Sequence, residues 1–269
     1  MVNYLAMDVH FMSQAAPDRP NEDFVLASND WCLVLDGATE LEGIDSGCRH
    51  GVRWYVSRLA LCLGSLLTAD SHASLADILE ESIEDVSRLH EDTCDLSNPD
   101  SPSSVVLMVR EREEFVDYLA LGDSAIVVDI ENQGQHVILD DRTAHLPSYK
   151  RKAVRHLRNS DDGFWVASTS PEAAKHALTG SVPKPPVRSI TLLTDGAYRL
   201  VERFDWSLSA VIELAKKAGP SEVIHEVRRT EAYAKPSKGK LHDDATVAFV
   251  WFKAGELPTI RPYLAACEV

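Results

Sequence analysis

The sequence predicts an α+β domain in which helices cover antiparallel sheets. Strand-like runs occur in groups separated by short polar breaks, and helical patterns lie between these groups instead of following every strand. A doubly wound parallel sheet would need strands and helices in strict alternation, so the grouping favours a layered α+β fold. We expect one domain over residues 1–254, followed by a tail over residues 255–269 that lies on the surface as an extended strap.

The N-terminal third predicts three strands followed by two amphipathic helices. The third strand-like run is wholly apolar and stops at Asp36-Gly37, and apolar residues then recur at helical spacing in two segments. The expected strands are Tyr4–Met12, Phe24–Ala27 and Trp31–Leu35, and the expected helices are Gly47–Leu67 and Ser74–Leu89.

The middle of the chain predicts an antiparallel meander. Four β-prone runs follow one another, and the breaks between them are charged or contain glycine, as tight turns do. The expected strands are Ser104–Arg110, Phe115–Leu121, Ala125–Ile130 and His136–Leu139. A basic helical pattern over residues 147–159 follows, which is either a docking surface for an acidic substrate or a solvated helix face.

The C-terminal part predicts two more strands at either end of a helical pair. The strand over Ser189–Thr194 ends at Asp195-Gly196, and the last strand is preceded by Asp243-Asp244. Before them we expect a short strand, a short helix and a proline-rich linker. The expected elements are strands Phe164–Ser168, Ser189–Thr194 and Ala245–Phe252, and helices over Pro171–Leu178, 206–217 and 220–234, with the linker at 182–186.

The charge balance excludes several classes of partner. Lys and Arg total 27 against 42 Asp and Glu, a formal charge of −15, whereas nucleic acids and anionic membranes require basic surfaces. No run of eighteen apolar residues is present to span a bilayer, and the N-terminus lacks the basic start of a signal peptide. We therefore expect a cytoplasmic protein that binds neither nucleic acid nor membrane.

The cysteines and histidines show no spacing typical of metal ligands. The five cysteines are scattered without a CxxC motif, which predicts a reducing compartment and no zinc ribbon. Cys48 and Cys62 are separated by about four helical turns, so both are expected to pack in the core. The histidines, His50 and His90 among them, are interpreted as ordinary surface or core residues.

Acidic residues recur where predicted strands end. Each acid alone fits a turn or a helix cap, but several at one end of a sheet would repel one another unless a cation neutralised them. Carboxylates suit hard cations such as Mg²⁺ or Mn²⁺. The clusters are Asn21-Glu22-Asp23, Asp36-Gly37, Gly122-Asp123-Ser124, Asp195-Gly196 and Asp243-Asp244.

Six short motifs in order resemble those of the metal-dependent protein serine/threonine phosphatases of the 2C type, the PPM family. The resemblance implies a four-layer α-β-β-α sandwich of two antiparallel sheets flanked by helices, with a two-metal centre at one edge and similarity to divergent bacterial members. The motifs are NED at 21–23, LDG at 35–37, PSS at 102–104, LGDS at 121–124, LTDG at 193–196 and HDDAT at 242–246.

The resemblance also implies roles for individual residues. Asp36 would bridge two ions, with the Gly37 carbonyl on one of them and Asp195 and Asp243 completing the ligands of the other. Asp23 would bind through water. Further roles implied are a third metal at Asp123, a weaker contribution from Glu22 and a structural role for Thr246.

Three positions depart from the family pattern. The phosphate-binding arginine expected at position 18 is replaced by Asp18, and Arg19 lies one position away, where it is the candidate to bind phosphate. The stretch 38–40 offers no histidine as general acid. Asp244 replaces an asparagine and adds a negative charge, which makes it a candidate additional ligand.

The expected function is hydrolysis of phosphoserine or phosphothreonine in proteins by water activated between two Mn²⁺ or Mg²⁺ ions. The partners expected are a phosphorylated protein substrate and a cognate serine/threonine kinase. Two alternatives stay open. One is a pseudophosphatase that binds a phosphoprotein or kinase without turnover, and the other is a small-molecule phosphoester hydrolase on the same scaffold.

Overall fold

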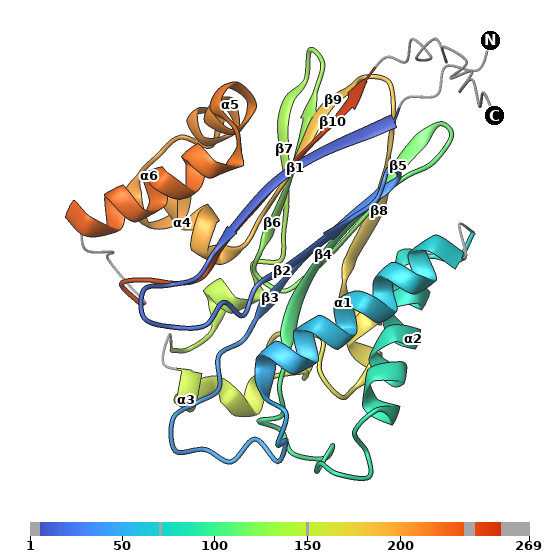
Figure 1. The fold of residues 1–269 in the computed structure, drawn as a ribbon, viewed down its shortest axis with the longest axis vertical. Coiled ribbons are helices and arrows are strands. Elements are labelled where there is room, and N and C mark those ends of the chain that lie inside the picture. The colour runs from blue at the N-terminus through green and yellow to red at the C-terminus, as the bar shows by residue number, and fades with distance from the viewer. Residues whose placement is uncertain (1–5, 70–71, 149–150, 234–239, 254–269) are drawn as a thin grey trace, which may run out of the picture.

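The computed structural model describes residues 6–69, 72–148, 151–233 and 240–253 (Figure 1). Two five-stranded sheets lie face to face, and all the strand pairs within them are antiparallel. One sheet has the order β1 (Ala6–Gln14), β10 (Ala245–Lys253), β9 (Val187–Leu193), β6 (Ala125–Ile130) and β7 (Gly134–Leu139). The other has the order β2 (Phe24–Ala27), β3 (Trp31–Gly37), β4 (Ser104–Glu111), β5 (Phe115–Leu121) and β8 (Leu178–Pro183).

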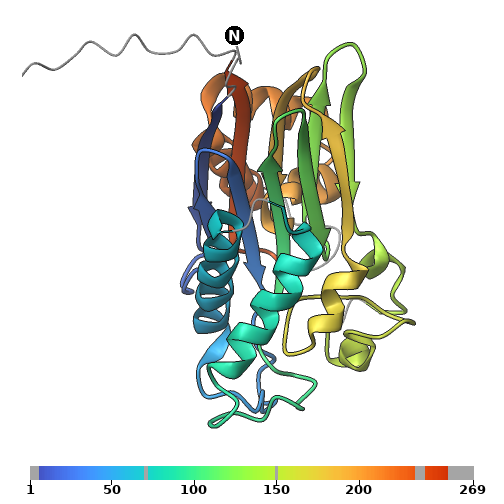
Figure 2. The same cartoon turned by 90° about the vertical axis from the view of Figure 1, so that its right-hand side faces the viewer.

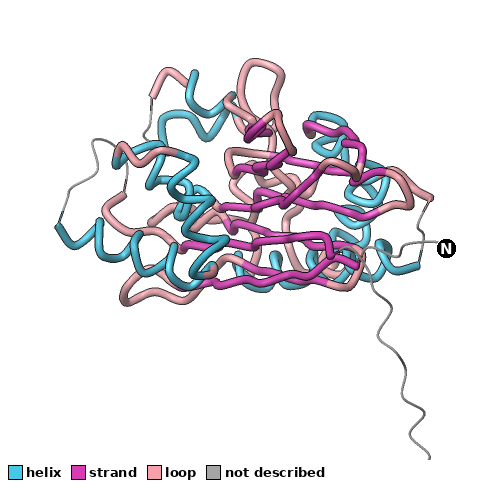
Figure 3. The backbone as a smooth tube through the Cα atoms, turned by 90° about the horizontal axis from the view of Figure 1, so that it is seen from above, coloured by secondary structure: helices cyan, strands magenta, loops and turns pink. Residues whose placement is uncertain are grey.

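Helices cover the outer face of each sheet, which makes the four layers visible from the side and from above (Figures 2 and 3). The pair α1 (Gly51–Ala69) and α2 (Leu75–Arg88) packs on the sheet that contains β3. The trio α4 (Asp195–Phe204), α5 (Leu208–Ala218) and α6 (Pro220–Tyr233) packs on the sheet that contains β10. The predicted α-β-β-α sandwich is confirmed.

Strand β3 shows how the sequence produces these layers. Its side chains alternate between two cores, because successive residues of a strand point to opposite faces of the sheet. Leu33 and Leu35 pack against the helices α1 and α2, whereas Cys32 and Val34 pack between the two sheets. A strand buried on both faces reads as a continuous apolar run, as Trp31–Leu35 does.

Four segments differ from the sequence-based expectations. Residues Leu178–Pro183 form the edge strand β8, where a helix end and a linker were expected, since an edge position tolerates proline. Residues Phe164–Ser168 make only isolated bridges to neighbouring segments. Helix α4 starts directly at Asp195 and was not predicted. The expected basic helix over 147–159 is reduced to α3 (Arg151–Val154) and the 3₁₀ turn Arg155–Leu157.

That basic segment is fastened to the neighbouring loop. Arg155 pairs with Asp100, and Arg158 donates hydrogen bonds to the carbonyl of Ser101 and the hydroxyl of Ser103. These two guanidinium groups therefore hold the connection before β4 in place. The remaining short turns are the 3₁₀ segments Arg142–His145 and Pro171–His176.

None of the described helices combines the length and the apolarity that a bilayer span requires. The predicted tail over residues 255–269, and the start of the first predicted strand at Tyr4, lie outside the described residues.

Candidate active site

The acidic residues selected from the sequence converge at one edge of the two sheets. Asp36 lies near the end of β3, and its charge interacts with those of Asp23, Asp195, Asp243 and Asp123. Antiparallel strands from two facing sheets reach this edge, which explains how acids far apart in the sequence become neighbours. Burial and these four like charges raise the pKa of Asp36 well above its usual range.

Asp23 lies directly before β2 and is the most enclosed of the acids. One oxygen, Oδ2, accepts hydrogen bonds from the hydroxyls of Thr246 at 2.6 Å and Thr194 at 3.1 Å. The other oxygen, Oδ1, is buried and has no partner among the described residues. Burial, with a further contribution from Asp244 and Asp195, raises the pKa of Asp23 to about 8. An unpaired buried carboxylate oxygen is costly unless a proton or a cation satisfies it.

Asp195 begins helix α4 immediately after strand β9. Burial and the charges of Asp243 and Asp123 raise its pKa to about 7, although Arg203 and Arg199 oppose the increase. Arg203 lies about two helical turns further along α4, and its Nη2 atom is 3.4 Å from Asp195 Oδ2. The helix N-terminus also favours a carboxylate at this position.

Asp243 is held by two cations from different segments. Arg199 on α4 places Nη2 3.3 Å from Asp243 Oδ2, and Lys240 places Nζ 3.1 Å from Oδ1. Because Arg199 is completely buried, its guanidinium fixes the position of Asp243 relative to the start of α4.

The glycines of the two Asp-Gly motifs permit very close backbone packing. A Cβ atom on Gly196 would lie 1.7 Å from the carbonyl oxygen of Asp244, and one on Gly37 would lie 2.5 Å from the carbonyl oxygen of Glu22. Both distances are far inside van der Waals contact, so only glycine fits. The absence of a side chain thus lets Asp36 and Asp195 each approach the segment that carries the next acid.

Asp244, a candidate ligand in the sequence, accepts hydrogen bonds from the backbone in the structure. Its Oδ1 accepts the backbone N–H of Ala16 and its Oδ2 accepts that of Glu22, both at 2.7 Å. These bonds tie the loop between β1 and β2 to the start of β10. A ligand role for Asp244 stays a prediction, and the observed contacts make it an anchor for the loop that ends at Asp23.

Asp123 occupies the tight turn between β5 and β6. Burial raises its pKa, as do the charges of Glu202 and Asp140, while a hydrogen bond from the Thr143 side chain opposes the increase. Its charge also acts on both Asp36 and Asp195. The turn therefore belongs to the same edge of the molecule as the other acids.

A cavity of about 370 Å³ opens beside Gly37. Its lining includes Glu22, whose pKa is raised by burial although Thr39 donates a 2.6 Å hydrogen bond to it. Arg19, the shifted arginine, lines this cavity, and Arg53 from the first turn of α1 lines it too. A phosphate-binding role for Arg19 stays a prediction. The sequence analysis missed Arg53, because nothing in a helical pattern tells which exposed arginine faces a cavity.

The donor set suits hard divalent cations. The site supplies carboxylate oxygens and backbone carbonyls, the ligands that Mg²⁺ and Mn²⁺ prefer. With one buried oxygen unpaired and several pKa values raised by burial and by mutual repulsion, the residues present fit a cationic centre.

An α-β-β-α sandwich with a carboxylate cluster at one edge of its sheets is the architecture of the metal-dependent protein phosphatases. A comparison with known families matches residues 13–229 to "Protein phosphatase 2C". The chain therefore belongs to the protein phosphatase 2C family, and the resemblance found in the sequence motifs is confirmed. The comparison with curated protein sequences gave no match.

Solved structures share the fold at low sequence identity. PppA, described as a regulatory component of the type VI secretion system in Pseudomonas aeruginosa, is 17% identical with a TM-score of 0.61, covering 92% of this chain and 98% of its own. The catalytic domain of the serine/threonine phosphatase PstP, in complex with two manganese ions, is 14% identical with a TM-score of 0.60, covering 92% and 99%. A phosphatase 2C from Toxoplasma gondii is 16% identical with a TM-score of 0.57, covering 92% and 95%.

Proposed function

We propose that this protein hydrolyses phosphoserine or phosphothreonine in protein substrates. The observation that carries the proposal is the cluster of buried, mutually repelling carboxylates beside a cavity lined by two arginines. Membership of the protein phosphatase 2C family supports it. The cavity offers two arginines to a phosphoryl group, beside Glu22 and Glu40, and the acids offer the ligands of a cationic centre.

Two Mn²⁺ or Mg²⁺ ions would be held by Asp36, the Gly37 carbonyl, Asp195 and Asp243, with Asp23 and Asp123 as further candidate ligands. When bound, such a pair makes hydroxide available from water near neutral pH and offsets charge on the phosphoryl oxygens. The chain's own residues position this centre. Thr194 and Thr246 orient Asp23, and the cations Arg203 and Arg199 orient Asp195 and Asp243.

Arg19 and Arg53 are proposed to bind the phosphoryl group of the substrate. Both residues line the cavity, and arginine matches phosphate geometry through paired N–H donors. The shift of the arginine from position 18 to 19 therefore does not remove positive charge from the cavity. Such charge would serve an enzyme and a pseudophosphatase that binds a phosphoprotein alike, so only a turnover measurement separates these two functions.

The experiment that tests the function compares p-nitrophenyl phosphate with a phosphothreonine peptide, each with Mn²⁺, with Mg²⁺ and with EDTA. We expect metal-dependent turnover that is lost, by at least about 100-fold in kcat, in Asp36→Asn and Asp195→Asn, because each removes a charge from the centre. Asp205→Asn is the matched control, since Asp205 is an exposed acid that directly follows the last residue of α4.

The outcomes separate the three candidate functions. Turnover of the peptide at a higher kcat/KM than the free ester supports a protein phosphatase, and the reverse order supports a small-molecule phosphoester hydrolase. A folded protein without turnover under either metal would overturn the catalytic proposal and support the pseudophosphatase.

A further inference from the structure

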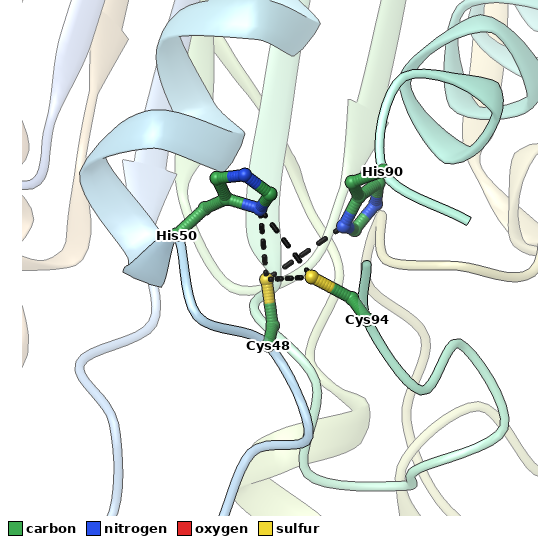
Figure 4. A group of neighbouring side chains, drawn as sticks. All are labelled: Cys48, His50, His90 and Cys94. Carbon is green, nitrogen blue, oxygen red and sulfur yellow. Dashed lines mark hydrogen bonds between the residues drawn. The ribbon is translucent and has the colours of Figure 1, made fainter. Parts of the chain in front are cut away.

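A second cluster of metal-ligating side chains lies apart from the carboxylates, where the start of α1 meets the end of α2. Cys48 and His50 come just before α1, and His90 and Cys94 come just after α2 (Figure 4). One ligand atom from each of these four residues lies within 4.8 Å of every other. The sequence-based interpretation of these residues as ordinary core and surface positions is corrected by this geometry.

The distances within this Cys48–His50–His90–Cys94 cluster are those of a tetrahedral ligand shell. The two sulfur atoms are 3.5 Å apart. The sulfur of Cys48 is 3.8 Å from His50 Nδ1 and 3.6 Å from His90 Nδ1, and the sulfur of Cys94 is 3.4 Å from His50 Nδ1. A tetrahedral Zn²⁺ with bonds of about 2.3 Å to sulfur and about 2.0 Å to nitrogen separates its ligand atoms by about 3.5–3.8 Å.

We propose that Cys48, His50, His90 and Cys94 bind one Zn²⁺ ion as a closed structural site. Two thiolates and two imidazoles are a ligand set that selects zinc over the hard cations of the carboxylate cluster. Four protein ligands complete the tetrahedron and leave no open position for water or substrate, so the ion would hold segments together and take no part in hydrolysis.

The surroundings of the cluster match such a site. Burial raises the pKa of the Cys48 thiol, against the backbone N–H groups of His50 and Gly51, whereas the pKa of the Cys94 thiol is lowered, against burial, with a contribution from the backbone N–H of Arg49. Donors of this kind favour the thiolate over the thiol. His90 is 2% exposed, and within the described part of the chain its ring nitrogens have only the Cys48 sulfur as a hydrogen-bond partner.

Trp54 fixes the orientation of both imidazole rings. It stacks on His50 with ring centroids 4.2 Å apart, and its centroid is 5.0 Å from that of His90. Metal-binding histidines need a fixed ring direction, and here an aromatic side chain from the first turns of α1 supplies it. The site is therefore organised before any ion binds.

The ion would join two loops that shape the candidate active site. These loops already touch, since the N–H of Asp95 donates to the carbonyl of Gly47 at 2.9 Å and the Asn98 side chain donates to the carbonyl of Asp45 at 3.1 Å. His50 also lines the cavity that contains Arg19. Zinc at this position would fix the wall of that cavity and the N-terminus of α1.

The test uses the full chain, purified under reducing conditions and freed of loosely bound ions in a buffer containing excess Mg²⁺. We expect about one zinc per chain by elemental analysis. After replacement by Co²⁺, the protein should show the strong visible bands of a tetrahedral site together with a thiolate charge-transfer band in the near ultraviolet.

Variants separate this site from the carboxylate cluster. Cys48→Ser combined with Cys94→Ser should remove zinc and the charge-transfer band. Cys62→Ser, a half-buried cysteine of α1 outside the cluster, and Asp36→Asn should keep both. Because the cobalt spectrum is recorded first on the unmodified chain, poor folding of the double variant would not hide the answer.

Three results would overturn the proposal. One is a reduced, folded protein that takes up neither zinc nor cobalt with a thiolate band. Another is a Cys48–Cys94 disulfide that forms in the reducing buffer and is found by mass spectrometry of an unreduced digest in place of zinc. A zinc content that falls in Asp36→Asn and persists in the double cysteine variant would assign the ion to the carboxylates and contradict the proposal as well.

Discussion

Both carboxylate oxygens of Asp244 accept backbone N–H groups, from Ala16 on one side and from Glu22 on the other. The bonds join the start of β10 to the loop that leads to Asp23. A hydrogen bond to a charged acceptor contributes about 1.5–3 kcal/mol to stability. This single side chain therefore fixes the loop that carries the NED motif.

Asp244→Asn is expected to lower the free energy of unfolding by about 2 kcal/mol. The amide keeps one acceptor oxygen, but its NH₂ group must face a backbone N–H that has lost its acceptor. Urea unfolding followed by tryptophan fluorescence measures the change. Asp18→Asn is the control, because Asp18 is an exposed acid of the same loop whose left-handed backbone asparagine tolerates.

An unchanged unfolding midpoint for Asp244→Asn, with the control also unchanged, would contradict the anchoring role. It would leave Asp244 free to serve as the additional ligand that the sequence predicted.

Among individual residues, the sequence predicted the site positions at which only one residue type satisfies the local geometry. Asp36 and Asp195 end apolar strands and are followed by glycine, which the structure explains by backbone approaches of 2.5 Å and 1.7 Å that no Cβ could allow. The part played by Arg53 was not predictable, since the direction of an exposed side chain depends on how α1 docks on its sheet. Likewise, the His50 and His90 pair is separated by two whole helices in the sequence and meets only because those helices pack side by side.

At the scale of elements, α4 and α6 are joined through a buried ion pair. Arg199 Nη1 lies 2.7 Å from Glu231 Oε1, and neither side chain is exposed. Glu231 also accepts a hydrogen bond from Arg228 and lies within hydrogen-bond distance of the His242 ring. Arg199 donates a further hydrogen bond to the carbonyl of Leu241. This network ties the helix that begins at Asp195 to the segment that carries Asp243.

Arg199→Met is expected to destabilise the protein by about 3–5 kcal/mol, because it leaves a buried carboxylate short of a partner. Thermal or urea unfolding measures the loss, and the combined variant Arg199→Met with Glu231→Leu should recover part of it, because Glu231 without Arg199 keeps only its contacts to Arg228 and His242. Arg229→Met is the control, since Arg229 pairs with Glu226 on the exposed face of α6, where a pair contributes less than about 1 kcal/mol.

If the single and combined Arg199 variants lost the same stability, the cost would come from lost packing at Arg199 and the ion pair would be incidental.

The elements that the sequence predicted well are those whose pattern is set by burial. Trp31–Gly37 and Ser104–Glu111 are buried on both faces and read as apolar runs, while α2 shows a clear apolar stripe. The failures lie where tertiary contacts decide. Leu178–Pro183 has an exposed, proline-ended pattern and becomes a strand only because β5 offers a free edge. Helix α4 was missed because its first residue, Asp195, belongs to the Asp-Gly motif that was expected only to end the preceding strand.

For the molecule as a whole, the carboxylate cluster opposes folding when no cation is present. Asp23 has a pKa of about 8 and Asp195 one of about 7 in the fold, against an ordinary value of 3.8 for an aspartate. Burial is the first cause of the increase in both, followed by the charges of neighbouring aspartates, while the hydrogen bonds from Thr246 and Thr194 oppose it at Asp23. The folded chain thus keeps protons that the unfolded chain has already released.

This difference predicts that the chelated protein loses stability as the pH rises from about 4 to about 8. Across that window the unfolded state binds fewer protons than the folded state, so the free energy of unfolding falls with increasing pH. Below about pH 4 both states are protonated and these two groups contribute nothing. Melting temperatures in EDTA, taken at intervals of pH, measure the slope.

Cations should remove the slope, because they bind the ionised cluster of the folded state only. We therefore expect Mn²⁺ to raise the melting temperature more at pH 8 than at pH 5, where protons compete for the same oxygens.

Asp23→Asn isolates the effect from the rest of the titration curve. It removes one buried charge while Thr194 and Thr246 still find an acceptor oxygen, so the chelated variant should melt higher than the parent at pH 8 and close to it near pH 4. A parent that gained stability from pH 5 to pH 8 in EDTA, relative to Asp23→Asn, would show that the cluster does not repel itself in the fold and that its acids need no cation.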